Sequence, residues 1–117
     1  MARFTKLNVW HQARTLLRMV SDATRSMRAE GDLKSQMRRA AISVVSNISE
    51  GSEHGSDREF RRFLVMANAS AAEVEAQVII AGDIDCLDHT TADIIAEQCR
   101  CVGRMLNRLM SRMDASS

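Results

Sequence analysis

The sequence contains no proline and no tyrosine, and it has only five glycines in 117 residues. A β-sandwich needs turn-forming residues at intervals of about ten positions, and this chain does not supply them. The same shortage excludes collagen-like, mucin-like and proline-rich sequences. Aromatic residues make up only 3% of the chain, which leaves few rings to stack on nucleic-acid bases.

Neither sign of charge dominates. The 16 Lys and Arg residues oppose 15 Asp and Glu, so a net charge of +1 gives no overall attraction to nucleic acid or to an anionic membrane. No apolar leader segment opens the chain, and the longest unbroken apolar run, Phe63 to Ala67, is far too short to span a bilayer. With 45% apolar and 26% charged residues, we expect one cytoplasmic domain over residues 1–117 with no membrane partner.

The residues that usually carry chemistry are scarce. Cys99 and Cys101 are two positions apart, so on a helix they would point to nearly opposite sides and share neither a metal nor a disulfide. Cys86 and His89 could give one thiolate and one imidazole, but no second pair completes a zinc site. The Glu-x-x-His motif of di-iron bundles and a phosphate-binding glycine loop are both missing. We therefore predict no catalytic, cofactor or metal residues and no enzymatic activity.

Apolar residues recur at steps of three and four along most of the chain, which predicts four amphipathic helices. Their expected ranges are about 7–28, 33–51, 57–82 and 89–113. Short connections place consecutive helices antiparallel, because a short loop cannot return the chain to a parallel neighbour. The predicted fold is all-α: an antiparallel up-down-up-down four-helix bundle.

Several residues have the character of helix caps. Ser56 and Glu59 form a capping box at the start of the third helix, and Asp88 or Thr90 is expected to cap the fourth.

The first connection, Glu30-Gly31-Asp32, is expected to place Gly31 in the left-handed region after one helix and Asp32 at the N-cap of the next. Gly51 fits the glycine that ends the second helix.

Two features exceed what one small bundle needs. The second and third helices have apolar faces wider than one stripe, which indicates self-association; alternatively, their alanines fill tight helix crossings. Residues 63–99 also contain seven acids and no Lys or Arg, whereas residues 100–117 contain four arginines. These charges could meet between subunits, or they could neutralise each other between helices.

A polar stripe follows the facing sides of the second and third helices. It predicts a network that fixes the register of this hairpin, with Arg39 paired to Glu73 or its neighbourhood. A polar ligand groove is the alternative interpretation. The predicted members of the network are Arg39, Ser43, Asn47 (or Ser46 in its place), Glu50, Ser70 and Glu73.

Three blocks of residues resemble the 23S rRNA-intervening-sequence proteins, a family of small bacterial four-helix bundles. The blocks are Leu7-x-Val9-Trp10-x-x-Ala13, Leu33-x-x-Gln36-Met37-Arg38-Arg39-Ala40-Ala41-x-Ser43-x-x-Ser46-Asn47-Ile48-Ser49-Glu50-Gly51, and Phe60-Arg61-Arg62-Phe63-Leu64-x-x-Ala67-x-x-Ser70-Ala71-x-Glu73-x-Glu75. The resemblance implies a cyclic homopentamer but no known activity, because the function of the family is unsettled. A related branch, the accessory proteins of diversity-generating retroelements, binds reverse transcriptase and RNA.

We therefore expect a non-enzymatic, ring-forming scaffold or binding protein whose main partner is itself. The alternative is an accessory protein that binds RNA, or an RNA-handling protein, through phosphate contacts that weaken in salt. The candidate phosphate contacts are Arg14, Arg18, Arg25, Arg58, Arg61 and Arg62.

Overall fold

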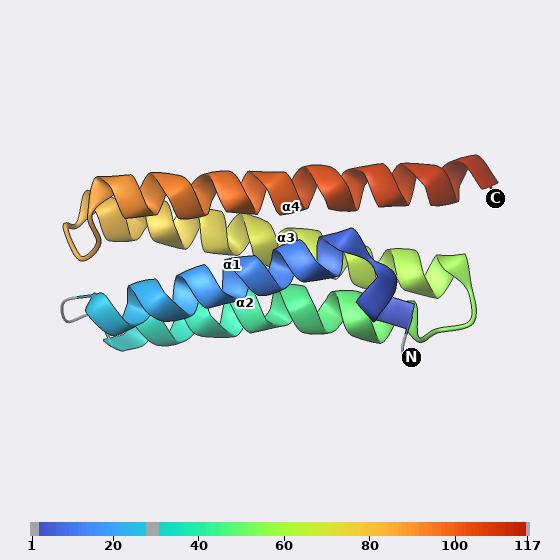
Figure 1. Cartoon of the computed structure of the whole chain (residues 1–117), viewed down its shortest axis with the longest axis horizontal. Helices are drawn as coiled ribbons and strands as arrows, with labels where there is room; N and C mark the ends of the chain where they lie inside the picture. The colour runs from blue at the N-terminus through green and yellow to red at the C-terminus, as the bar shows by residue number, and fades with distance from the viewer. Residues whose placement is uncertain (1–2, 28–30, 117) are drawn as a thin grey trace.

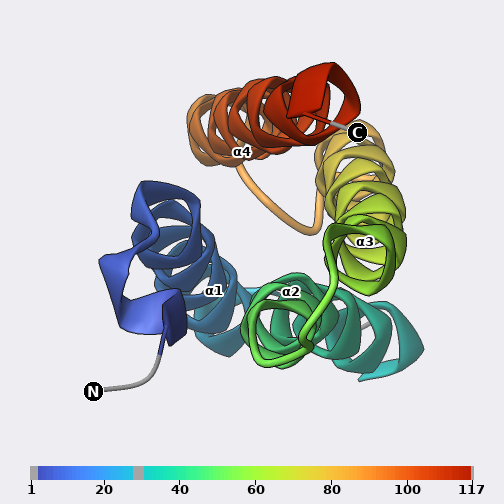
Figure 2. The ribbon, with the colours of Figure 1, turned by 90° about the vertical axis from the view of Figure 1, so that its right-hand side faces the viewer.

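The computed structural model describes residues 3–27 and 31–116 (Figure 1). One short 3-10 turn and four α-helices follow in order: η1 Arg3–Lys6, α1 Asn8–Ser26, α2 Gly31–Ser52, α3 Asp57–Asp83 and α4 His89–Ser116. Consecutive helices pack antiparallel, and α4 closes the bundle against α1, so that α1 and α3 lie diagonally opposite (Figure 2). The predicted four-helix bundle is confirmed, and it measures 46 × 24 × 20 Å.

The core is a single apolar column that runs between the four helices. Each helix supplies at least one large side chain with almost no exposed surface, and examples are Leu16, Ile48, Leu64 and Leu106. Burial of one such side chain stabilises a fold by about 1.5–3 kcal/mol. The stripes at three- and four-residue spacing therefore account for most of what holds the helices together.

Two predicted caps are present. The Ser56 Oγ accepts a hydrogen bond from the Glu59 amide at 3.2 Å and opens α3. The Asp88 carboxylate accepts from the Thr91 amide at 2.8 Å and from the Thr91 hydroxyl at 2.7 Å, which opens α4. These hydrogen bonds from Thr91 favour the charged carboxylate and lower the pKa of Asp88.

The cap predictions around Gly31 are wrong. Gly31 is the first residue of α2, and no glycine in the described ranges has a positive φ angle. Asp32 lies in the first turn of α2 instead of before it, where its charge still suits the positive end of the helix dipole. Glu30, which was expected to end the preceding helix, lies outside the described residues.

The prediction for Gly51 is also wrong, because α2 continues through it to Ser52. Gly51 is buried against the start of α3. A Cβ atom at this position would lie 2.6 Å from the Phe63 Cβ and 3.1 Å from a ring carbon of Phe60. The glycine is therefore required for the close approach of two helices and not for a left-handed turn.

Candidate functional site

The centre of the predicted polar network joins α2 to α3. The Ser43 and Ser70 hydroxyls are 2.8 Å apart, and the Asn47 Nδ2 donates to the Ser43 carbonyl at 2.9 Å and to its hydroxyl at 3.0 Å. All three side chains are half-buried between the helices. Since these hydrogen bonds all lie within the hairpin, this cluster is suited to fixing the register of α2 against α3.

The other three predicted members do not join the network. Arg39, Glu50 and Glu73 are exposed, and within the described residues no ion pair forms between Arg39 and Glu73. The predicted pair is therefore wrong for this chain. Each step of four residues rotates a side chain by about 40° around the helix axis, so Arg39 lies further toward solvent than Ser43 does.

The outward face of α3 is apolar for about four turns. Val65, Ile79 and Ile80 are 48%, 46% and 47% exposed, although they are aliphatic. Three exposed alanines lie between them at helical spacing. We call this surface the α3 stripe; its residues are Val65, Ala69, Ala72, Ala76, Ile79 and Ile80.

Helix α3 is long and apolar enough to cross a membrane by length and composition alone. Two opposite faces give it this character. Its inner face packs into the bundle core through residues such as Leu64 and Val74, and its outer face is the α3 stripe. The surplus apolar surface predicted for α2 is smaller, with Ile42 exposed by 50%.

The six candidate phosphate contacts fall into two groups. Arg14, Arg18 and Arg25 are exposed on α1. Arg14 lies over the Trp10 ring at 4.8 Å, and Arg25 forms an ion pair with Asp22. These contacts leave the outer face of α1 basic.

The second group lies at the start of α3, which is diagonal to α1 (Figure 2). It contains Arg58, Arg61 and Arg62. Arg62 bonds to Glu59 at 3.2 Å and lies over the Phe63 ring at 4.8 Å. The structure therefore does not bring the six arginines together into one surface.

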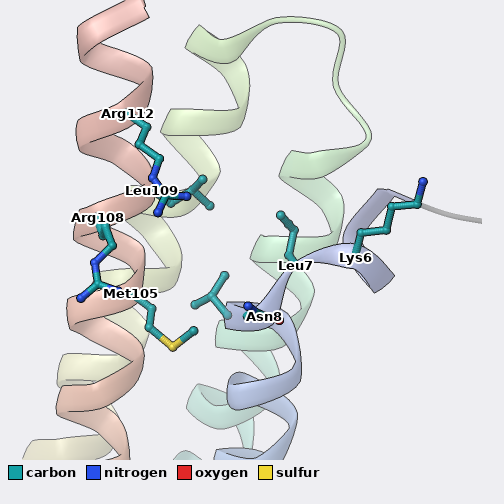
Figure 3. Close-up of a pocket in the computed structure, with 8 residues that line it drawn as sticks. Lys6, Leu7, Asn8, Met105, Arg108, Leu109 and Arg112 are labelled. Carbon is teal, nitrogen blue, oxygen red and sulfur yellow. The ribbon is translucent and has the colours of Figure 1, made fainter.

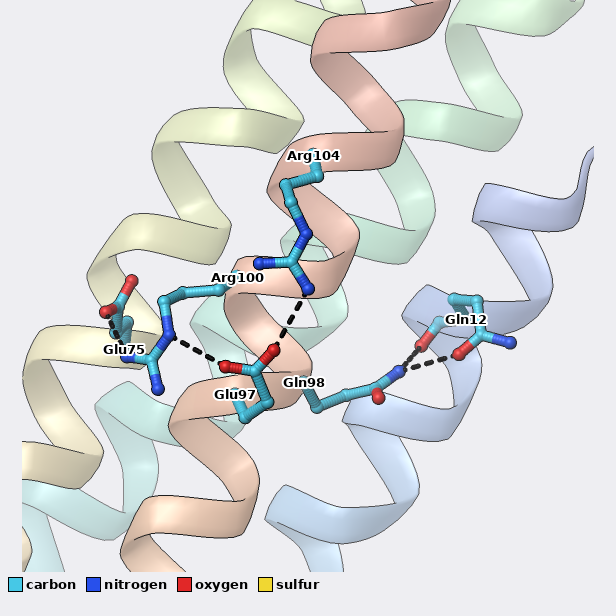
Figure 4. A network of polar contacts seen from close by, with 6 residues as sticks. All are labelled: Gln12, Glu75, Glu97, Gln98, Arg100 and Arg104. Carbon is cyan, nitrogen blue, oxygen red and sulfur yellow. Dashed lines mark hydrogen bonds and ion pairs between the residues drawn. The ribbon is translucent and has the colours of Figure 1, made fainter.

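Part of the segregated charge is neutralised between α3 and α4 (Figure 4). Arg100 bonds to Glu75 at 2.9 Å and to Glu97 at 3.0 Å, and Glu97 also accepts from Arg104 at 2.9 Å. The bonds from Arg104 and then Arg100 lower the pKa of Glu97, and Glu97 and then Glu75 raise the pKa of Arg100. Neutralisation between helices is one of the two alternatives that the sequence leaves open for these charges. The residues that pair could not be predicted from the sequence.

The opposite edge of α4 is joined to α1 by a polar bridge that no sequence pattern predicts. The Gln98 Nε2 donates to the Gln12 carbonyl at 2.9 Å and to the Gln12 Oε1 at 3.0 Å (Figure 4). The two residues are 86 positions apart, so no local sequence signal pairs them.

The buried Cys99 lacks the properties of a reactive thiol. Burial, with the nearby Glu75 charge as a smaller cause, raises the pKa of the Cys99 thiol to about 12, so this thiol stays protonated at neutral pH. Over residues 3–27 and 31–116, no three His, Cys, Asp or Glu side chains lie close enough together to hold a metal ion.

Comparison with known proteins identifies the fold and the family. A crystal structure of a protein of unknown function from the S23 ribosomal protein family of Bacteroides thetaiotaomicron superposes with a TM-score of 0.80 at 16% sequence identity. The match covers 87% of this chain and 97% of that one. No curated protein shows significant similarity to this chain. The sequence model of the 23S rRNA-intervening sequence proteins matches residues 5–108. The chain therefore belongs to the 23S rRNA-intervening sequence protein family.

Proposed function

We propose that this protein is a non-enzymatic cytoplasmic scaffold or binding protein that assembles with copies of itself into a closed ring. A pentamer is the assembly that the resemblance to its family implies. The observation that carries the proposal is the α3 stripe, an apolar helix face that no helix covers within the described part of the chain. A face of this kind on a small soluble domain favours association.

The composition of the α3 stripe suits helix packing. Ala69, Ala72 and Ala76 would let another backbone approach closely, while Val65, Ile79 and Ile80 offer aliphatic surface on either side. Covering the exposed half of one such aliphatic side chain is worth about 1 kcal/mol. Many such contacts must act together, because association also costs translational and rotational freedom.

A ring with an odd number of subunits needs heterologous contacts, in which one surface of each subunit meets a different surface of the next. The stripe would then pack against another exposed apolar side chain. Ile94 on α4, exposed by 55%, is the candidate.

Paired charges placed on the stripe test this proposal. The variant Ala72→Glu/Ala76→Glu should fold normally, because both positions are exposed in the single chain, and it should lose the oligomer. Ser35→Glu, an exposed position on α2, is the control and should keep the oligomer. Light scattering behind a sizing column gives the masses. An oligomer of unchanged mass in the stripe variant would contradict the proposed interface.

The second candidate function is RNA binding through phosphate contacts. It is favoured by the basic outer face of α1, where Arg14 and Arg18 have no acidic partner in the described part of the chain. Binding of this kind falls steeply with salt. Fluorescence anisotropy of a labelled RNA at two salt concentrations tests it.

A further inference from the structure

A pocket of about 220 Å³ opens between the beginning of α1 and the last turns of α4 (Figure 3). Met105 and Leu109 extend from α4 toward Leu7 and Asn8 on the other side (Figure 3). Together with Val9, these apolar side chains form the floor. The pocket is large enough for one aliphatic side chain.

Positive charge flanks this floor on both sides. Lys6 comes from η1, and Arg108 and Arg112 come from α4. All three are exposed, no acid lines the pocket, and in the described part of the chain none of their side chains forms a hydrogen bond or ion pair. The neighbouring Arg100 and Arg104, in contrast, are paired with acids.

The arrangement of these cations narrows the choice of ligand. Figure 3 shows Lys6 at the η1 edge of the pocket with its side chain directed away from α4, while Arg108 and Arg112 lie along α4. An apolar side chain with a carboxylate on either side of it fits the floor and both sets of cations.

The chain itself exposes such a segment at the other end of the bundle, in the turn between α3 and α4 (Figure 1). Ile84 is 50% exposed, and the flanking Asp83 and Asp85 are both exposed. Hydrogen bonds hold the turn in shape, because the Ile84 amide donates to the Ile80 carbonyl at 3.0 Å and the Asp85 amide donates to the Gly82 carbonyl at 3.1 Å. Asp85 adopts a left-handed φ of 61°. Little conformational entropy would therefore be lost when the turn docks.

We infer that the Asp83-Ile84-Asp85 turn of one copy docks into the Lys6–Arg108–Arg112 pocket of a second copy. Ile84 covers the apolar floor, and the two aspartates face the cations on either side. Because the two surfaces lie at opposite ends of the 46 Å long axis, the contact is head-to-tail. In an assembly whose bundles run parallel to the ring axis, this contact stacks one ring on the next.

The contact is small, so a single copy of it is weak. In the proposed ring, several identical contacts act together and raise the affinity of one ring for the next. This part of the inference rests on the proposed function. Its charge pairs are exposed, so salt should weaken it. Its residues do not overlap with the α3 stripe, which allows the two contacts to be tested separately.

Two variants separate the halves of the contact. Ile84→Ser removes the apolar anchor but leaves the pocket intact. Arg108→Glu/Arg112→Glu reverses the charge of the pocket but leaves the turn intact. All three positions are exposed, so both variants should keep the circular dichroism of the native protein. Ile42→Ser, at an isoleucine with the same 50% exposure on α2, is the matched control.

Sedimentation velocity over a concentration series is the measurement, at about 50 mM and about 500 mM salt. We call the smallest assembly that persists at high salt the base unit. At low salt we expect the native protein and the Ile42→Ser control to form assemblies of two or more base units. Each test variant should weaken this association by about tenfold or more. Mixing the two test variants should restore association between one base unit of each. The Arg108→Glu/Arg112→Glu variant supplies an intact turn and the Ile84→Ser variant an intact pocket. No larger assembly should form, because the remaining turn and the remaining pocket are both altered.

The mixing result is specific for a head-to-tail contact. No association in the mixture, or multiples of the base unit that persist in either variant alone, would overturn the inference. The mass of the base unit reports on the proposed ring independently. A base unit of 13.0 kDa contradicts the ring, whereas restored association between the two variants still supports the docking of the turn.

Discussion

Gly51 of α2 and Phe63 of α3 are in direct contact, with no room between them for even one methyl group. A Cβ atom on Gly51 would lie 2.6 Å from the Phe63 Cβ, closer than two carbons can pack. The two helices therefore cross at this point because residue 51 has no side chain.

Gly51→Ala should consequently destabilise the protein, although alanine is normally the better residue inside a helix by about 1 kcal/mol. We expect a net loss of about 1–3 kcal/mol in the free energy of unfolding, because the helices must move apart. Gly103→Ala is the control, since a Cβ there meets only the Asn68 Oδ1 at 3.4 Å, and it should be neutral or stabilising. Urea unfolding measures both, and equal effects of the two substitutions would contradict the close contact.

Ser70→Ala should cost about 0.5–1.5 kcal/mol by removing the hydrogen bond to Ser43. In a double-mutant cycle, Ser43→Ala and Ser70→Ala should cost less together than the sum of the two single changes. Glu73→Ala, one turn away but exposed, should change stability by less than about 0.5 kcal/mol. A loss above about 2 kcal/mol at Glu73 would mean that this carboxylate has a buried partner.

The Cys99 thiol should make the stability of the fold depend on alkaline pH. Its pKa is raised from 9.0 to about 12 in the folded protein, so between these values the folded state holds a proton that the unfolded state has lost. The contribution of Cys99 to the free energy of unfolding is therefore fully present below pH 9. It falls as the pH rises above 9, by up to about 1.4 kcal/mol per pH unit. The Cys99→Ala variant should lack this decline. If the free energy of unfolding changes with pH in the same way for both proteins, the Cys99 thiol is not shielded from water.

RNA binding, if the second candidate function is correct, should be weak and strongly sensitive to salt. Arg14→Ala/Arg18→Ala should reduce it further. Arg100→Ala/Arg104→Ala changes the net charge equally but removes arginines that are already paired with Glu97 and Glu75, so it should have a smaller effect. Nanomolar binding that survives about 300 mM salt, or a clear sequence preference, would favour RNA binding over the scaffold function.

The fold could be predicted from the sequence because its determinants are local. Apolar steps of three and four residues located all four helices, and the side chains of Ser56 and Asp88 cap α3 and α4 as their positions in the sequence indicated. The sequence prediction for Gly51 is wrong because a glycine near a helix end usually adopts a left-handed conformation. Its contact with Phe63 becomes visible only once the crossing of α2 and α3 is known.

The surfaces were less predictable because they depend on how far each side chain is rotated around its helix. Ser43 and Ser70 meet, whereas Arg39, one turn before Ser43, is exposed. The pocket between η1 and α4 unites residues such as Lys6 and Arg112 that are distant in sequence, and no spacing rule connects them.

The mass of the native protein in solution tests the central claim most directly. Light scattering behind a sizing column, at micromolar protein and moderate salt, should give the mass of a multimer of the 13.0 kDa chain, with five copies expected from the family resemblance. A mass of one chain at every accessible concentration would contradict the ring and the role assigned to the α3 stripe.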